Sequence, residues 1–226
     1  MPQYRTLNKD FFKQWSPEMA YVLGYIAADG AITIGKRGNH YLDVISTDRE
    51  LPDLVQNLLR SNHKISVRDG NPKWKPRYRL QIGSKELVED LAYIGIFPKK
   101  AKRLPMPNVP SEYFYHFVRG YFDGDGNVNF TVIKRKDRPS LAKHFHCVFT
   151  SCSIKFLNAL HGRLREMAGL KGGSLYFSQN AHRLLYAGYD SMRLYRFMYN
   201  NLGSLYLKRK HKYFTIAIRK FREKLQ

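Results

Sequence analysis

The chain of 226 residues has only two cysteines, Cys147 and Cys152, and few acidic residues for its many basic ones. Two cysteines cannot build a multi-bridge disulfide scaffold or a zinc site with four cysteine ligands. No run of apolar residues approaches the ~18 that a membrane-spanning helix needs, and the first residues lack the apolar core of a secretory signal peptide. These absences favour a protein of a reducing, intracellular compartment that is neither secreted nor inserted in a membrane.

Positive charge is what the chain has in excess. Lys and Arg number 39 against 18 Asp and Glu, which gives a formal net charge of +21. A folded chain with this charge repels itself unless a polyanion neutralises it, and nucleic acid is the leading partner. The hydrophobic share of 43% is enough for a core and excludes wholesale disorder. The glycine-rich phosphate-binding motifs and the H-E-x-x-H zinc motif are missing, so the sequence gives no support to a nucleotide cofactor or a zinc hydrolase.

The sequence contains two copies of one motif. Met19–Gly30 and Tyr115–Gly126 both contain Gly-Tyr-x-x-x-Asp-Gly, and their aspartates, Asp29 and Asp125, are 125 − 29 = 96 residues apart. After each copy the apolar spacing predicts two strands, a helix, two more strands and a further helix. The sequence therefore predicts a mixed α/β protein built from two αββαββα repeats.

A proline-rich segment separates the repeats. Residues 104–110 read LPMPNVP, with three prolines in seven residues, which is typical of an extended tether. We therefore divide the chain into an N-terminal half at 1–103, a linker at 104–110 and a C-terminal half at 111–226. Both halves are basic, so both are expected to face the polyanion.

The motif segments are expected to be helices that pack closely. Gly24 and Ala28 lie four residues apart in the first copy, and Gly120 and Gly124 do so in the second. Residues at this spacing share one face of a helix, and small residues there let two backbones approach. The pattern predicts two motif helices packed side by side.

Each predicted motif helix ends in Asp-Gly. For a single copy, glycine as a helix stop explains the pair. If the two helices pack in parallel, Asp29 and Asp125 meet at the negative ends of both helix dipoles, where carboxylates repel each other. A divalent cation with a preference for carboxylate oxygen, Mg²⁺ or Mn²⁺, relieves that repulsion. A basic protein that holds such a cation against a polyanion points to phosphodiester hydrolysis.

The two motifs resemble a known family. VLGYIAADG at Val22–Gly30 and VRGYFDGDG at Val118–Gly126 are similar to the two motif copies of a single-chain, monomeric LAGLIDADG homing endonuclease. The resemblance covers nearly the whole chain, because the order of the elements matches too. Ala27 stands where the name motif has Asp, while Asp123 keeps it.

The resemblance implies a fold and a metal site. The motif helices would form the interface between pseudo-symmetric halves, and two four-stranded antiparallel sheets would form a saddle on the DNA major groove. Asp29 and Asp125 would bind the catalytic divalent metal ions, helped by the backbone carbonyls of Ala28 and Gly124. Mg²⁺ is the expected cofactor, and Mn²⁺ or Ca²⁺ can occupy the same sites.

The resemblance also implies a basic residue near each active site, late in each half. The sequences PKKA and KRKH fit this place, so the catalytic role goes to Lys100 and Lys210, with Lys99 and Arg209 as alternative registers. A lysine there can stabilise the developing charge of the phosphorane or organise the attacking water. Contact with a DNA phosphate is the alternative role. Ser46 and Thr150, which end the second strand of each half, are expected to position water near the metals.

Alternation along the predicted strands separates an apolar face from a polar face that can read DNA. Arginine, glutamine and asparagine on the polar face can bond to base edges, whereas basic residues in the hairpin loops contact phosphates. The predicted DNA-binding residues are Thr33, Lys36, Arg37, Lys64, Ser66, Arg68, Lys73, Lys75, Arg77, Arg79, Gln81, Asn127, Asn129, Thr131, Lys134, Arg135, His146, Gln179 and Arg183.

The sequence thus predicts a site-specific double-strand DNA endonuclease of the homing type. The resemblance implies a long target site and short 3′ overhangs. The alternative is a catalytically silent nucleic-acid binder of the same fold, either an RNA maturase that assists splicing of an intron RNA or a DNA-binding regulator. Retention of both Asp29 and Asp125 favours the enzyme, since a pure binder gains nothing from paired carboxylates.

Overall fold

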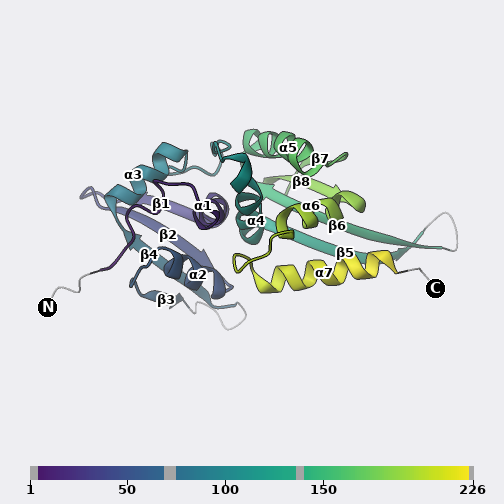
Figure 1. Ribbon diagram of the computed structural model, residues 1–226, viewed down its shortest axis with the longest axis horizontal. Coiled ribbons are helices and arrows are strands. Elements are labelled where there is room, and N and C mark those ends of the chain that lie inside the picture. The colour runs from purple at the N-terminus through teal and green to yellow at the C-terminus, as the bar shows by residue number, and fades with distance from the viewer. Residues whose placement is uncertain (1–4, 69–74, 136–139, 224–226) are drawn as a thin grey trace. The chain divides into compact units, whose positions relative to one another are not determined.

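Two four-stranded antiparallel sheets, each covered by helices, carry the fold (Figure 1). The structure is a computed structural model that describes residues 5–68, 75–135 and 140–223. The chain divides into two compact units, Met1–Gly124 and Asp125–Gln226. Within the described residues, no helix combines the length and the apolar character that a membrane crossing requires.

The first unit holds the first sheet, whose strands pair in the order β1-β2-β4-β3. Helices α1, α2 and α3 pack against these strands. In chain order the elements are α1 (Pro17–Asp29), β1 (Gly30–Ile34), β2 (His40–Ser46), α2 (Glu50–Leu58), β3 (Ile65–Arg68), β4 (Arg77–Gly83), α3 (Lys85–Ile94), a 3-10 turn (Ser111–Tyr113) and α4 (Phe114–Asp125), of which only the last residue belongs to the second unit.

The second unit repeats this topology, with strand order β5-β6-β8-β7. Helices α5, α6 and α7 pack against its sheet. The elements are β5 (Gly126–Lys134), β6 (Leu141–Ser151), α5 (Ile154–Ala168), β7 (Ser174–Ser178), β8 (Ala181–Ala187), α6 (Tyr189–Tyr199) and α7 (Lys208–Arg222). The predicted mixed α/β fold with two αββαββα repeats is confirmed, and the second repeat closes with two helices in place of one.

Local sequence explains where α1 begins. The Ser16 hydroxyl accepts a hydrogen bond from the backbone N–H of Met19 at 3.1 Å, and Pro17 occupies the first helical position. A serine cap satisfies a backbone donor that has no partner inside the helix, and proline lacks such a donor. These two residues therefore fix the start of the helix that carries the first motif.

The predicted alternation of strand faces also holds. In β4, Leu80 and Ile82 are fully buried, while Arg79 and Gln81 on the other face keep part of their surface. In β2, Leu42 and Val44 are likewise fully buried. The buried face of the sheet packs under the helices, and the opposite face is left for another partner.

The segment at 104–110 has neither helix nor strand, as its prolines predict. Leu104 and Val109 are nonetheless buried, and the ring of Pro105 lies 3.0 Å from the position of a Cβ atom on Gly95. The segment is therefore packed against its surroundings at several points rather than a loose tether. The division at 1–103, 104–110 and 111–226 describes how the sequence repeats, whereas packing keeps most of α4 with the first unit.

Candidate active site and nucleic-acid interface

Helices α1 and α4 pack together through glycines. A Cβ atom on Gly24 would lie 2.1 Å from the carbonyl oxygen of Phe117, and one on Gly120 would lie 2.0 Å from the carbonyl oxygen of Tyr21. No side chain fits at such distances. The two contacts are reciprocal, because Phe117 follows Tyr21 by 117 − 21 = 96 residues and Gly120 follows Gly24 by 120 − 24 = 96 residues. The predicted close approach of two related motif helices is thus present.

The C-terminal ends of these helices also meet. A Cβ atom on Gly124 would lie 2.5 Å from the Cβ of Ala28 and 3.3 Å from Oδ2 of Asp29. Asp29 is the last residue of α1, and Asp125 directly follows Gly124 as the last residue of α4. In both helices burial ends near the motif aspartate, since Asp29 is exposed and Asp125 half-buried.

The donors at these helix ends fit a divalent cation. The carbonyls of the last turn of a helix point beyond its C-terminal end, so those of Ala28 and Gly124 suit the role of oxygen ligands that the resemblance implies. A set made of carboxylate and carbonyl oxygens suits Mg²⁺, Mn²⁺ or Ca²⁺ rather than a metal that prefers sulfur or imidazole. The small size of Gly124 leaves room beside the carboxylate of Asp29. In the part of the chain that the structure describes, no group of three or more His, Cys, Asp or Glu side chains is arranged to hold a metal ion.

A buried hydrogen bond joins the same two helices. The Tyr21 hydroxyl donates to Oδ2 of Asp123 at 2.7 Å, and both side chains are buried. The pseudo-equivalent positions, 96 residues away, hold Phe117 and Ala27, which cannot make this bond. Asp123, the name-motif aspartate of the second copy, is therefore a structural residue of the helix pair here.

Neither of the two predicted catalytic lysines is fully exposed. Lys210, in the first turn of α7, donates a hydrogen bond from Nζ to the carbonyl oxygen of Gly126 at 2.7 Å, which places its ammonium group next to the residue after Asp125. Lys100 is buried, with 8% of its surface exposed, while its neighbour Lys99 is exposed and has a left-handed backbone with φ of 56°. Of Lys100 and its alternative Lys99, Lys100 is therefore the one whose side chain is buried, and Lys99 is the one that faces solvent.

The predicted water-positioning pair is offset by one residue in the structure. Gly30 pairs with Val44 and Gly126 with Phe149, so Ser46 corresponds to Ser151 rather than to Thr150. Ser46 and Ser151 also make the same hydrogen bond, in which each hydroxyl accepts from the backbone N–H two residues later. Thr150 lies on the opposite, polar face of β6. The role of these residues toward water stays a prediction.

The polar face of the first sheet gathers many of the predicted DNA-binding residues. They include Thr33 on β1, Ser66 and Arg68 on β3, and Arg77, Arg79 and Gln81 on β4, with Lys64 just before β3. Sequence reasoning missed Asp43, which lies on the same face of β2. Nε and Nη2 of Arg79 each lie 2.6 Å from Oδ1 of Asp43, and Nε2 of Gln81 donates to it at 3.2 Å.

The second sheet presents a matching polar face. Asn127, Asn129 and Thr131 lie on β5, and Asn129 pairs with His146 of β6. Burial and the adjacent His144 lower the pKa of His146, which favours a neutral imidazole that can both donate and accept. Arg183 of β8 donates from Nη2 to Oε1 of Gln179 in the β7–β8 turn.

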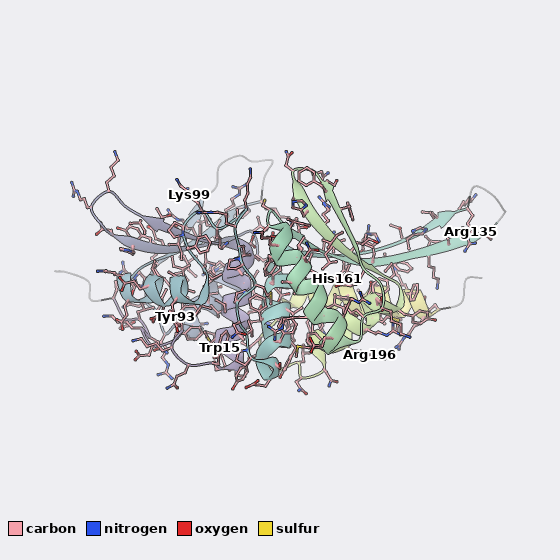
Figure 2. The ribbon with its side chains drawn as sticks, turned by 90° about the horizontal axis from the view of Figure 1, so that it is seen from above. Trp15, Tyr93, Lys99, Arg135, His161 and Arg196 are labelled. Atoms are coloured by element: carbon pink, nitrogen blue, oxygen red, sulfur yellow. The ribbon has the colours of Figure 1, made fainter. Side chains whose placement is uncertain are left out.

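The remaining predicted contacts lie at the ends of hairpins. Lys36 and Arg37 are exposed in the β1–β2 turn, and Lys75 is exposed just before β4. Lys134 is the last residue of β5, and Arg135 follows it at the end of the long β5–β6 hairpin (Figure 2). Lys73 lies outside the residues that the structure describes.

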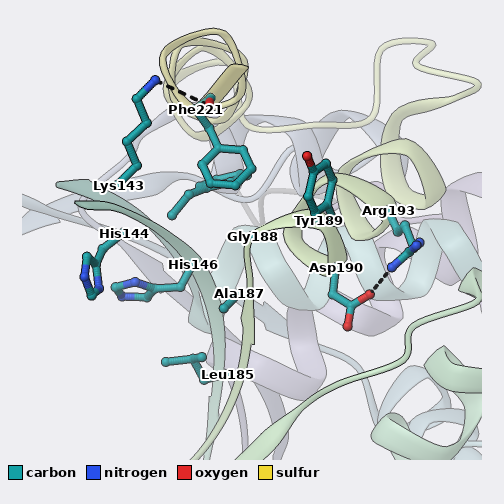
Figure 3. Close-up of a pocket in the computed structure, with 11 residues that line it drawn as sticks. Lys143, His144, His146, Leu185, Ala187, Gly188, Tyr189, Asp190, Arg193 and Phe221 are labelled. Atoms are coloured by element: carbon teal, nitrogen blue, oxygen red, sulfur yellow. Dashed lines mark hydrogen bonds and ion pairs between the residues drawn. The ribbon is translucent and has the colours of Figure 1, made fainter. Parts of the chain in front are cut away.

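A pocket of about 690 Å³ opens in the second unit, where β8 ends and β6 continues (Figure 3). His144 and His146 point into one side of it, and Phe221 of α7 borders the other. Its one carboxylate, on Asp190, is engaged by Arg193 at 2.6 Å and by the backbone N–H of Gly172 at 2.6 Å. The pocket therefore offers no free carboxylate for a metal and is not part of the predicted site.

Comparison with known proteins identifies the fold. Residues 16–95 match the family model described as a LAGLIDADG-like domain. The structure is similar to that of the I-LtrWI LAGLIDADG homing endonuclease bound to target DNA, with a TM-score of 0.63 at 11% identity over 95% of this chain and 92% of that chain. This chain has the LAGLIDADG fold.

Two further solved structures share the LAGLIDADG fold across both repeats. The meganuclease I-AabMI bound to uncleaved DNA gives a TM-score of 0.60 at 14% identity, with 94% of this chain and 99% of that chain covered. I-SmaMI bound to an uncleaved DNA target in the presence of calcium ions gives 0.61 at 12% identity, with 92% and 91% covered. No curated protein matches the sequence. The likeness is one of fold, and the family model covers only the first repeat.

Proposed function

We propose that this chain is a site-specific DNA endonuclease of the homing type that cuts both strands of a long target site and leaves short 3′ overhangs. The observation that carries the proposal is the reciprocal glycine packing of α1 and α4, both of which end in aspartate. A binding module has no use for two carboxylates at adjoining helix ends, where they repel phosphate. A hydrolase that depends on a divalent cation needs them.

The roles of the residues follow from their positions. Asp29 and Asp125, with the carbonyls of Ala28 and Gly124, are the ligands of divalent metal, with Mg²⁺ as the working ion and Mn²⁺ or Ca²⁺ able to replace it. Bound metal would stabilise the charge on the attacking and leaving oxygens of the phosphodiester. Lys210, whose Nζ already lies at the residue after Asp125, adds positive charge that favours the transition state over the ground state.

Double-stranded DNA is the proposed partner of the two polar sheet faces. The asparagine, glutamine and arginine side chains of these faces match the donors and acceptors of base edges in the major groove. Basic residues at the hairpin ends contact phosphates and set the position of the protein. Because one chain carries both aspartates, we propose that it acts as a monomer. Structural neighbours solved with target DNA and with calcium ions support this assignment by fold.

Selection of cleaved sites from a randomised duplex library tests the proposal. The wild-type protein with Mg²⁺ should enrich one long sequence whose cut ends carry short 3′ overhangs, and chelation of the metal should abolish the cuts. The variants Asp29→Asn and Asp125→Asn should bind the selected site as well as the wild type but not cut it. Asp53→Asn, which changes a half-buried carboxylate of α2, is the control and should cut normally.

Three outcomes would count against the proposal. Sequence-specific binding without cleavage by the wild type would identify a catalytically silent binder of the same fold. Cleavage at near wild-type rate by either aspartate variant would remove the metal-ligand assignment. Preference for a structured intron RNA over every duplex would identify a maturase.

A further inference from the structure

Asp43 sits on the polar face of a sheet in a protein that carries a net charge of +21. Its side chain is 8% exposed, and it lies opposite Gln81 in the register of β2 and β4. Oδ1 accepts from Nε of Arg79 at 2.6 Å and from Nε2 of Gln81 at 3.2 Å. One carboxylate therefore holds the two side chains of β4 that are best suited to read bases.

The contact leaves part of Arg79 available. A guanidinium group has five N–H donors in a rigid plane. Nε and Nη2 of Arg79 face Asp43, which uses one edge of the plane, and no residue in the described part of the chain accepts from Nη1. The edge formed by Nη1 and the second N–H of Nη2 remains. That edge is a two-pronged donor, which matches O6 and N7 of a guanine.

We propose that Asp43 is a specificity-determining positioning residue: it fixes the plane of Arg79 so that this arginine reads one guanine in the target site. The inference rests on the proposed function, because it needs this face to lie on DNA. An arginine side chain that no other residue restrains can change rotamer and contact the nearest phosphate. Such a contact contributes affinity for DNA of any sequence. An arginine held by a carboxylate has lost much of that freedom, and a carboxylate near DNA repels phosphate. Asp43 thus exchanges general affinity for discrimination.

The second repeat supplies an internal comparison. Ile45 pairs with Arg79, and Thr150 pairs with Arg183, so the two arginines occupy equivalent register positions. The equivalents of Asp43 and Gln81 there are Val148 and Leu185, which offer no charge. Arg183 instead donates to the uncharged Gln179. We therefore expect stricter base preference at the position read by Arg79 than at the one read by Arg183.

The test measures binding to the selected site and to every single-base variant of it, in Ca²⁺ and at two salt concentrations. Asp43→Asn keeps the size of the side chain and removes its charge. It should lose roughly tenfold to a hundredfold of discrimination at one G·C pair, while its affinity for unrelated DNA stays equal or rises. Arg79→Ala should lose preference at the same pair. Asp53→Asn, which removes an equal charge from α2, should change neither.

Arg79→Lys gives a second route that does not depend on the fold of the Asp43 variant. Lysine can still pair with Asp43 but lacks the planar fork, so the same pair should lose its preference. Unchanged discrimination in Asp43→Asn or in Arg79→Lys would overturn the inference, as would a loss spread evenly over all positions. Failure of the wild type to prefer any DNA sequence would overturn the proposed function itself, and the inference with it.

Discussion

Lys210 donates a hydrogen bond from Nζ to the carbonyl oxygen of Gly126 at 2.7 Å and so joins the first turn of α7 to the start of β5. Gly126 directly follows Asp125, the predicted metal ligand. Leu207 and Phe214 are buried on either side of the lysine in sequence, which holds α7 in place. The hydrogen bond therefore holds the ammonium group beside the backbone of the predicted site.

Replacement of this lysine should affect rate more than binding. Lys210→Met should slow cleavage by about 10²- to 10³-fold, as for a lost electrostatic stabiliser, with little change in DNA affinity. Lys208→Met, an exposed lysine one half-turn earlier, is the matched control and should cut at near the wild-type rate. Single-turnover cleavage and equilibrium binding, measured on the same site, separate the two effects. A change confined to affinity would reassign Lys210 to phosphate contact.

The first repeat offers a parallel pair. Lys100→Met should reduce the cleavage rate in the same way, because Lys100 is buried, whereas Lys99→Met should have a small effect, because Lys99 faces solvent. Rates for the two variants under saturating protein decide the register. If Lys99→Met is the slower enzyme, the assignment of the catalytic lysine in this half is off by one residue.

Repetition made the helix pair predictable from the sequence. A shift of 96 residues superposes Gly24 on Gly120. Small residues four positions apart on one face of each helix predict that the two helix backbones approach closely. The strand faces were predictable for a similar reason, since alternation in β4 separates Leu80 and Ile82 from Arg79 and Gln81. Both signals are local or internal to the repeat, so they need no knowledge of which strands become neighbours.

Other features depend on the register between strands, which the sequence pattern does not predict. Asp43 meets Arg79, 36 positions further along the chain, only because β2 pairs with β4. The same register matches Ser46 with Ser151 and not with Thr150, a one-residue offset that moves a side chain to the other face of the sheet. The first repeat also matches a family model over residues 16–95, whereas the second is recognised through its fold.

The glycines of the helix pair should tolerate no side chain. Gly24→Ala and Gly120→Ala each place a Cβ atom about 2 Å from a backbone oxygen, so the helices must separate. Overpacking of this kind costs about 1–3 kcal/mol or more. Gly162→Ala is the control, because that glycine lies inside α5 with no atom near its Cβ position. It should stabilise by about 0.5–1 kcal/mol. Urea unfolding of all three variants checks the contrast, and equal losses would argue against the contact.

Acid should weaken the protein through His116 on α4. Nη2 of Arg119 lies 2.7 Å from Nδ1 of this histidine. Burial and the charge of Arg119 lower the pKa of His116 from 6.5 to about 4. Between about pH 6.5 and pH 4, this histidine is protonated in the unfolded chain but neutral in the folded chain. The free energy of unfolding therefore falls as the pH drops through this range. His116→Gln can still accept from Arg119 but does not titrate. Urea unfolding between about pH 7 and pH 5 should show a smaller loss for this variant than for the wild type.

The effects of replacing Tyr21 and Asp123 on the free energy of unfolding should be coupled, because a hydrogen bond joins their side chains. Tyr21→Phe removes the donor of this buried, charge-assisted hydrogen bond, which costs about 1–3 kcal/mol. Asp123→Ala removes the acceptor of the same hydrogen bond at a similar cost. The double variant places phenylalanine opposite alanine, which is the combination that the chain itself has at the related positions Phe117 and Ala27. It should therefore be less destabilised than the sum of the single variants by 1 kcal/mol or so. Unfolding free energies of the four proteins complete the cycle, and strict additivity would mean that the two groups do not depend on each other.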